Sequence, residues 1–197
     1  SFADCGFRPG TFYPCYGMAE ATVFITGKTK KAPLKIQYLI SSALEQNQIV
    51  TSIEQAGAQS VVSCGEIGAG DKLAIVDPHS FTRCSTDQIG EIWLSGPSVA
   101  QGYWQQPVAT AQAFQAYLAD TGEGPFLRTG DLGFLQENEL FVTGRLKDLF
   151  ILRGRNYYPQ DIEYTVEQCH PALQPSSGAA FGIEIDGDEQ LVIVQEV

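Results

Sequence analysis

The sequence has no apolar run long enough to cross a membrane as a helix, which takes about 20 residues. Its first ten residues do not resemble a secretory signal, so we expect no membrane span. Positive charge is also scarce: 12 Lys and Arg stand against 23 Asp and Glu, which gives a formal net charge of −11. An acidic surface repels a nucleic-acid backbone, so nucleic acid is not an expected partner.

Cysteine is sparse and scattered. The five cysteines are odd in number and show no C-x-x-C spacing, so they indicate neither a disulfide framework nor a zinc site. A reducing, cytoplasmic setting is therefore expected. His79 and His170 match no catalytic pattern, and a structural role is expected for both. With 197 residues, of which 44% are hydrophobic, the chain can build one good core or parts of two.

Residues 144–163 contain four of the twelve basic residues. Their apolar run Leu149–Leu152 predicts a short buried strand, and Pro159 suits the first turn of a helix that begins there. A basic cluster within an acidic chain can bind an anionic ligand, and it can equally be a solvated loop. The four basic residues of the cluster are Arg145, Lys147, Arg153 and Arg155.

Two earlier segments carry residues suited to a nucleotide. In Tyr16-Gly17-Met18-Ala19-Glu20, an aromatic ring beside a glycine lets a base stack, and a carboxylate is a hard oxygen ligand for Mg²⁺. In Thr129-Gly130-Asp131, a carboxylate can accept hydrogen bonds from two hydroxyls at once. Taken singly, each segment is also explained by an ordinary turn.

In order along the chain, these segments resemble the adenylate-forming (ANL) superfamily, whose members make acyl-AMP. Three segments are most similar to those of fatty acyl-AMP ligases: Arg-Leu-Lys-Asp (145–148), Arg-Gly-Arg-Asn (153–156) and Tyr-Pro-Gln-Asp-Ile-Glu (158–163). The resemblance implies an α/β fold that is locally α+β. Residues 1–147 would be the C-terminal part of the large AMP-binding domain, including a β-rich subdomain, and residues 148–197 would begin the small C-terminal domain.

The resemblance also implies roles for the first segment. The Tyr16 ring would lie against adenine, with Gly17 and Ala19 beside the nucleotide, and Glu20 would act in catalysis by holding Mg²⁺ at the ATP phosphates. Ala19 replaces the usual threonine, so a hydroxyl contact to phosphate is absent. Cys15 stands where many relatives carry a polar residue near the adenine amine.

Further roles are implied downstream. Asp131 would accept hydrogen bonds from the ribose hydroxyls, and Arg145 would contact the ribose or phosphate side of the nucleotide as a second catalytic residue. Lys147 falls at the hinge about which the small domain rotates. Gly154 matches a glycine beside the channel for the phosphopantetheine arm.

Residues 28–63 show no legible chemistry. They stand where fatty acyl-AMP ligases carry an insertion that disfavours the use of CoA, and a variable surface excursion without a role is the alternative. Beyond them, the patterns predict strands at 72–78, 90–97 and 139–143, and a helix at 110–119 with Ala111, Phe114 and Leu118 on one face. They also predict a hairpin, with strands at 178–183 and 190–197 around Asp186-Gly187. Trp93 and Trp104 are expected to pack in the core.

The reaction implied is the activation of a fatty acid by ATP to acyl-adenylate and pyrophosphate, with transfer to an acyl carrier protein or the carrier domain of a polyketide or peptide synthase. Two alternatives stay open: a long-chain acyl-CoA ligase or peptide-synthetase adenylation domain, and a non-catalytic adenylation-like binding module. A phosphate loop before Ser1 and a lysine after Val197 would complete the site, so we expect the segment alone to be inactive.

Overall fold

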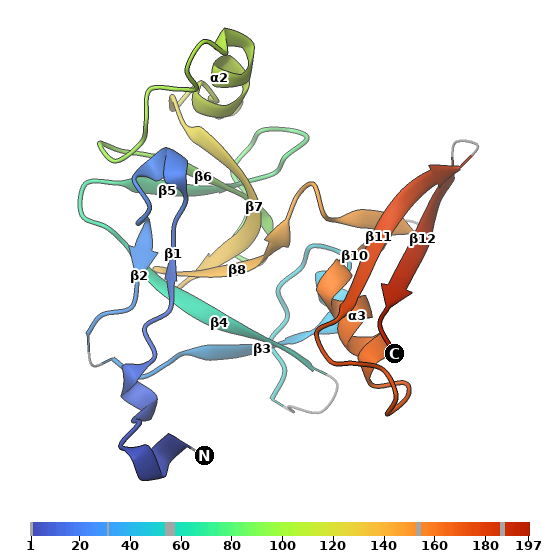
Figure 1. The fold of residues 1–197 in the computed structure, drawn as a ribbon. Coiled ribbons are helices and arrows are strands. Elements are labelled where there is room, and N and C mark those ends of the chain that lie inside the picture. Colours follow the sequence, from blue (N-terminus) through green and yellow to red (C-terminus); the bar gives the residue numbers. More distant parts are fainter. Residues whose placement is uncertain (1, 31, 54–57, 153–154, 186–187) are drawn as a thin grey trace.

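A computed structural model describes residues 2–30, 32–53, 58–152, 155–185 and 188–197. Its centre is an eight-stranded sheet in the order β1-β2-β4-β8-β7-β6-β5, with β3 paired to β4 (Figure 1). All of its strand pairs are antiparallel. The strands are β1 (Cys15–Tyr16), β2 (Thr26–Gly27), β3 (Ile36–Ile40), β4 (Ala58–Ile67), β5 (Lys72–Val76), β6 (Gly90–Ser95), β7 (Leu127–Gln136) and β8 (Glu139–Arg145).

The last quarter of the chain forms smaller elements to the right of this sheet in Figure 1. Strands β9 (Phe150–Leu152) and β10 (Arg155–Tyr157) pair with each other, and helix α3 (Pro159–Glu167) follows with proline in its first turn, as predicted. Strands β11 (Gly178–Ile185) and β12 (Asp188–Gln195) pair as the expected antiparallel strands, and the connection predicted at 186–187 lies outside the described residues.

The remaining helices are short. They are η1 (Phe2–Cys5), η2 (Pro9–Thr11), η3 (Ala19–Ala21), α1 (Ser41–Leu44) and α2 (Pro107–Phe114). Helix α2 corrects the prediction of a helix at 110–119, because the chain leaves the helix so that Ala116 can exchange two backbone hydrogen bonds with Phe126. Leu118 is buried all the same, but from the loop beyond the helix.

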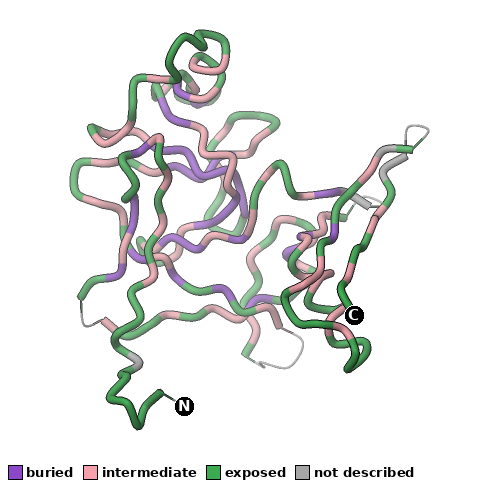
Figure 2. Tube along the Cα trace, in the orientation of Figure 1, coloured by how far each residue is buried: buried purple, intermediate pink, exposed green. Residues whose placement is uncertain are grey.

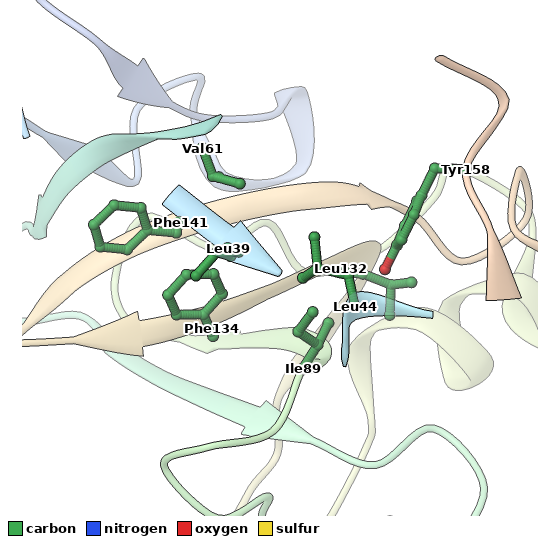
Figure 3. Close-up of a cluster of buried hydrophobic side chains, with 8 residues drawn as sticks. All are labelled: Leu39, Leu44, Val61, Ile89, Leu132, Phe134, Phe141 and Tyr158. Carbon is green, nitrogen blue, oxygen red and sulfur yellow. The ribbon is translucent and has the colours of Figure 1, made fainter. Parts of the chain in front are cut away.

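Buried residues follow the strands of the large sheet (Figure 2), and β6 is buried along most of its length. One hydrophobic cluster joins the sheet to the start of the C-terminal elements (Figure 3). In it the Phe134 and Phe141 rings stack with centroids 4.9 Å apart, and Tyr158 lies at the edge next to α3. The full cluster is Leu39, Leu44, Val61, Ile89, Leu132, Phe134, Phe141 and Tyr158.

Part of the 28–63 region belongs to the large sheet and its core. Strand β3 and the first half of β4 extend the large sheet, and Leu39, Leu44 and Val61 are buried in the cluster of Figure 3. The apolar residues of this region have mixed spacing, and β3 has a single fully buried residue, Leu39, so its burial pattern gave no clear strand signal. That this region is the insertion of the fatty acyl-AMP ligases stays a prediction.

The two tryptophans differ. Trp93 is 1% exposed and packs against Phe126, as predicted. The prediction for Trp104 is wrong, since this side chain is 87% exposed in the loop before α2. Its neighbour Tyr103 packs instead, with its ring edge-on to Phe114.

Among the described residues, none of the helices has the length and apolar character needed to cross a membrane.

Candidate active site

A cavity of about 800 Å³ opens between the 17–20 segment, helix α2 and the ends of β7 and β8. It brings together residues that lie up to about 130 positions apart in the sequence, including most of those predicted to hold a nucleotide. It is lined by Gly17, Met18, Ala19, Glu20, Glu91, Ala109, Gln112, Ala113, Arg128, Thr129, Gly130, Asp131, Arg145, Leu146 and Lys147. Tyr16 is not among the lining residues, but its hydroxyl donates to the carboxylate of Asp131, which is. Gly154 lies outside the described residues.

A tight turn after β1 places Glu20 at the cavity. The amides of Val23 and Ile25 donate to the carbonyls of Met18 and Tyr16, both at 2.9 Å, so the chain folds back on itself. Gly17 is required here, because a Cβ atom on it would overlap the carbonyl of Val23. The turn leaves the Glu20 side chain directed to the cavity while its backbone carbonyl accepts from the Ala100 amide at 2.8 Å.

Asp131 lies opposite Arg145 in the register of β7 and β8. Arg145 Nε donates to Asp131 Oδ1 at 3.1 Å, and the Tyr16 hydroxyl donates to Oδ2 at 2.6 Å. Each carboxylate oxygen has a second lone-pair direction, so both can still accept from a ligand. Burial, and then the hydrogen bond to Asp131, raise the pKa of the Tyr16 hydroxyl above its usual range, so Tyr16 stays a donor.

Sequence reasoning missed this contact of Tyr16, to which it gave only a stacking role. It also missed Tyr103, whose hydroxyl donates to Glu20 Oε1 at 2.8 Å. The Gly102-Tyr103-Trp104 motif was the signal for Tyr103, but nothing in the sequence indicates which carboxylate its hydroxyl meets.

Glu20 is the candidate metal ligand. Within the described ranges, no group of three or more His, Cys, Asp or Glu side chains is close enough to hold a metal ion by itself. Mg²⁺ commonly takes one or two protein carboxylates and fills its other positions with water and substrate phosphates. A single carboxylate at the edge of a nucleotide cavity fits that mode of binding.

Three cationic side chains line the cavity, and two of them are paired. Arg128 bonds to Glu91 through Nε and Nη2, and Arg145 bonds to Asp131. Lys147 makes no ion pair within the part of the chain that the structure describes. The Glu91–Arg128 pair is a further feature that sequence reasoning missed, although a lone charged residue in the apolar strand 90–95 was a signal for it.

Residues 41–60 contact the segment that leads into α3. Gln59 Nε2 donates to Asp161 Oδ1 at 2.9 Å, and Arg155 pairs with Glu45 at 3.3 Å. The Asn156 amide also donates to the Glu45 carbonyl at 3.0 Å. Burial raises the pKa of the Asp161 carboxyl, while the hydrogen bond from Gln59 opposes that shift. Polar contacts therefore join the 28–63 region to the C-terminal elements, beside a second cavity of about 810 Å³.

Comparison with known proteins places this geometry in context. The family model described as AMP-binding enzyme matches residues 2–104. The chain is 50% identical over its whole length to the medium-chain-fatty-acid–[acyl-carrier-protein] ligase JamA of Moorena producens, and covers 34% of that protein. It is 40% identical to the putative fatty-acid–CoA ligase fadD21 of Mycobacterium leprae, again over the whole chain and 34% of the relative.

Solved structures agree with these relatives. The crystal structure of fatty acid AMP ligase from Legionella pneumophila matches with a TM-score of 0.71 and 42% identity, over 100% of this chain and 34% of that one. A structure from a study of fatty acyl-adenylate ligases from E. coli and L. pneumophila matches with a TM-score of 0.80 and 32% identity, over 98% of this chain and 33% of that one. The chain thus spans about a third of the length of its relatives.

Proposed function

The chain belongs to the AMP-binding enzyme family, and from that premise we propose that the protein carrying it is a fatty acyl-AMP ligase. It joins a fatty acid to the AMP part of ATP, releases pyrophosphate and passes the acyl group to an acyl carrier protein. The observation that carries the proposal is the single cavity in which Glu20, Asp131, Arg145 and Lys147 converge. Relatives named as ligases of medium-chain fatty acids for a carrier protein support the substrate and the acceptor.

The chemistry needs an oriented nucleotide. The fatty acid carboxylate attacks the α-phosphorus of ATP, a P–O bond forms, and the bond to pyrophosphate breaks. Asp131, held by Tyr16 and Arg145, accepts hydrogen bonds from the ribose hydroxyls and so fixes the position of the nucleotide. Arg145 and Lys147 place positive charge beside the anionic substrate, where negative charge develops as the bond to pyrophosphate breaks.

Mg²⁺, when bound, neutralises phosphate charge and assists departure of pyrophosphate. Of the described residues, Glu20 is the one we assign to hold it. The Tyr103 hydroxyl on Oε1 orients that carboxylate and leaves Oε2 free of this contact.

A ligase that transfers the acyl group to CoA is the second candidate, favoured by relatives named as putative fatty-acid–CoA ligases. The contacts of Gln59 with Asp161 and of Glu45 with Arg155 support the first candidate. They tie the 28–63 region to the segment that begins the proposed small domain, and this region stands where fatty acyl-AMP ligases carry an insertion that disfavours the use of CoA.

The test uses the full-length protein with ATP, Mg²⁺, a medium-chain fatty acid and excess CoA, with products identified by mass. We expect acyl-AMP to accumulate without conversion to acyl-CoA, and to disappear when a phosphopantetheinylated carrier protein is added. Asp131→Ala and the omission of Mg²⁺ are the controls, and each should abolish acyl-AMP. Rapid formation of acyl-CoA would support the second candidate, and the absence of any acyl-AMP would support a non-catalytic binding module.

A further inference from the structure

Glu91 is the most fully buried ionisable residue beside the nucleotide cavity. It is 1% exposed, at the second position of β6, where both of its neighbours are also buried. A buried carboxylate is costly unless several donors surround it. Glu91 has them: its oxygens accept from Arg128 Nε and Nη2 at 3.0 and 2.8 Å, from Trp93 Nε1 at 2.9 Å and from the Gly130 amide at 3.2 Å.

Two of these donor residues, Arg128 and Gly130, lie on an irregular part of β7. Glu91 pairs with Leu132 but Trp93 pairs with Arg128, so the register between β6 and β7 shifts along this stretch. On the other side of β7, the register with β8 shifts between Leu132 and Gly133. The segment 128–132 is therefore bulged with respect to both neighbouring strands, a feature that commonly redirects a side chain at a functional site.

The bulge leaves backbone groups that the sheet does not pair, and side chains pair them instead. Gly130 has φ +72°, which is the left-handed region, and its amide donates to Glu91. Thr129 Oγ1 donates to the Ile92 carbonyl at 2.7 Å and accepts from the Asp131 amide at 3.1 Å. Residues 128, 129 and 130 are thus each fixed to β6, immediately before Asp131.

We propose that Glu91 is a positioning residue for nucleotide binding: by holding Arg128 and the Gly130 amide, it sets the bulge that presents the Asp131 carboxylate to the ribose. This inference rests on the proposed function, since it takes Asp131 as the ribose ligand. Glu91 is given no direct contact with the nucleotide, because its oxygens already accept from Arg128, Trp93 and the Gly130 amide. The contribution of the Glu91–Arg128 pair lies in the geometry of the loop more than in global stability, because buried ion pairs contribute little net stability.

The experiment measures binding rather than turnover. The full-length protein and its Glu91→Gln variant are titrated with AMP and with 2′,3′-dideoxy-AMP, which lacks both ribose hydroxyls. Hydrogen bonds to a charged group predict that the wild type prefers AMP by about tenfold or more. If Glu91 acts through Asp131, Glu91→Gln loses most of that preference. The NH₂ group of glutamine would face the N–H donors of Arg128 or Gly130, which then lose their acceptor. We expect the ratio of the two dissociation constants to fall to within about threefold.

A matched control separates positioning from stability. Leu39→Ala removes a fully buried side chain from β3, which is not a neighbour of β6 or β7 in the sheet, and lowers stability. A purely structural role for Glu91 would weaken binding of both ligands equally in the two variants. The proposal requires the AMP preference to fall in Glu91→Gln and to persist in Leu39→Ala.

Two further variants make the outcomes distinct. Asp131→Asn tests the proposed function: if the wild type shows no preference for AMP, or if Asp131→Asn keeps it, both the ribose contact and this inference are overturned. If Asp131→Asn loses the preference while Glu91→Gln keeps it, only the positioning role is overturned. Should Glu91→Gln fail to fold, Glu91→Asp keeps the charge but draws the carboxylate back from Arg128 and the Gly130 amide, and a retained preference there overturns the inference.

Discussion

At the scale of single residues, the site depends on how one carboxylate is held. Asp131 has Tyr16 on one oxygen and Arg145 on the other, from partners 115 and 14 positions away in the sequence. With both oxygens fixed, the carboxylate plane has little freedom to rotate, and its remaining lone pairs keep a constant direction. A ligand with two adjacent hydroxyls then binds without first having to order the side chain.

Tyr16→Phe tests directly whether the Tyr16 hydroxyl fixes the Asp131 carboxylate. The change keeps the ring and removes only the hydroxyl that donates to Asp131 at 2.6 Å. We expect the dissociation constant for AMP to rise about threefold to tenfold, since one hydrogen bond to a charged group is lost. Titration of the full-length variant measures it, and Tyr117→Phe, an exposed tyrosine in the loop beyond α2, is the control. An unchanged AMP affinity would mean that the Tyr16 hydroxyl does not order Asp131.

Residue identities at the site were predictable, but their partners were not. Glu20, Asp131 and Arg145 stand out because their residue types and local motifs suit a nucleotide, and the structure brings them to one cavity. The bonds from Tyr16 to Asp131 and from Tyr103 to Glu20 depend on which strands and loops become neighbours. Local sequence does not encode that choice, because each hydroxyl could serve several acceptors.

At the scale of elements, strands with clear boundaries were predictable. The runs that became β5, β6 and β8 are apolar and end at turn residues, so pattern alone located them. Strand β7 was read in its first half as a turn motif, because Gly130 and Asp131 are poor strand formers. Pairing with both β6 and β8 overrides that local preference, and the conflict is relieved by the bulge at the functional site.

In the 28–63 region, we predict that strand β3 contributes to the stability of the fold. Leu39 in β3 is 0% exposed and packs in the cluster of Figure 3, whereas the next residue, Ile40, is 39% exposed. We expect Leu39→Ala to lower the free energy of unfolding by about 2–5 kcal/mol, and Ile40→Ala by less than about half as much. Urea unfolding of the full-length variants measures both changes. A loss below about 1 kcal/mol for Leu39→Ala would show that β3 contributes little to the core.

This packing also limits how the region can be tested. Removing residues 28–63 would delete β3 and half of β4, so a loss of function would follow from unfolding alone. Substitutions at Gln59 and Glu45, whose side chains reach the C-terminal segment, examine the region without opening the core.

At the scale of the whole molecule, the cavity carries more positive charge than the acidic net charge of the chain would suggest. The chain carries a formal charge of −11, yet three cationic side chains line the nucleotide cavity. Arg128 and Arg145 are neutralised by Glu91 and Asp131, which leaves Lys147 as the described cavity cation without a carboxylate partner. An anionic ligand in this cavity would therefore meet a positive charge where the chain passes from the large sheet to the C-terminal elements.

The same residue lies at the predicted boundary between the two domains, 1–147 and 148–197. The amides on either side of Lys147 are fixed: Leu146 donates to the Gly130 carbonyl at 2.8 Å and Asp148 to the Arg145 carbonyl at 3.2 Å. Across the described part of the chain, no backbone hydrogen bond from the Lys147 amide is present. A peptide unit without such a bond, between two that have them, is where the backbone can change direction at least cost.

Lys147→Pro tests whether this freedom is used. Proline removes no backbone hydrogen bond here but fixes φ near −65° and also restricts the backbone of the preceding Leu146, so it limits rotation at this point of the chain. If the C-terminal elements rotate about Lys147 between two half-reactions, we expect acyl-AMP formation by Lys147→Pro to stay within about threefold of that by Lys147→Ala, which lacks the same cation. Transfer to the carrier protein should be slower in Lys147→Pro than in Lys147→Ala by at least about tenfold, which is roughly 1.4 kcal/mol of added barrier.

The two half-reactions are measured separately, by pyrophosphate release and by mass of the acylated carrier protein. Lys147→Ala is the matched control, because it removes the cation and keeps the backbone free. Equal slowing of transfer in both variants would assign the effect to charge and contradict a hinge at Lys147. Slowing of acyl-AMP formation by proline alone would instead mean that the first half-reaction already needs a backbone angle that proline cannot adopt. The hinge between the two predicted domains would then lie elsewhere in the 144–150 segment.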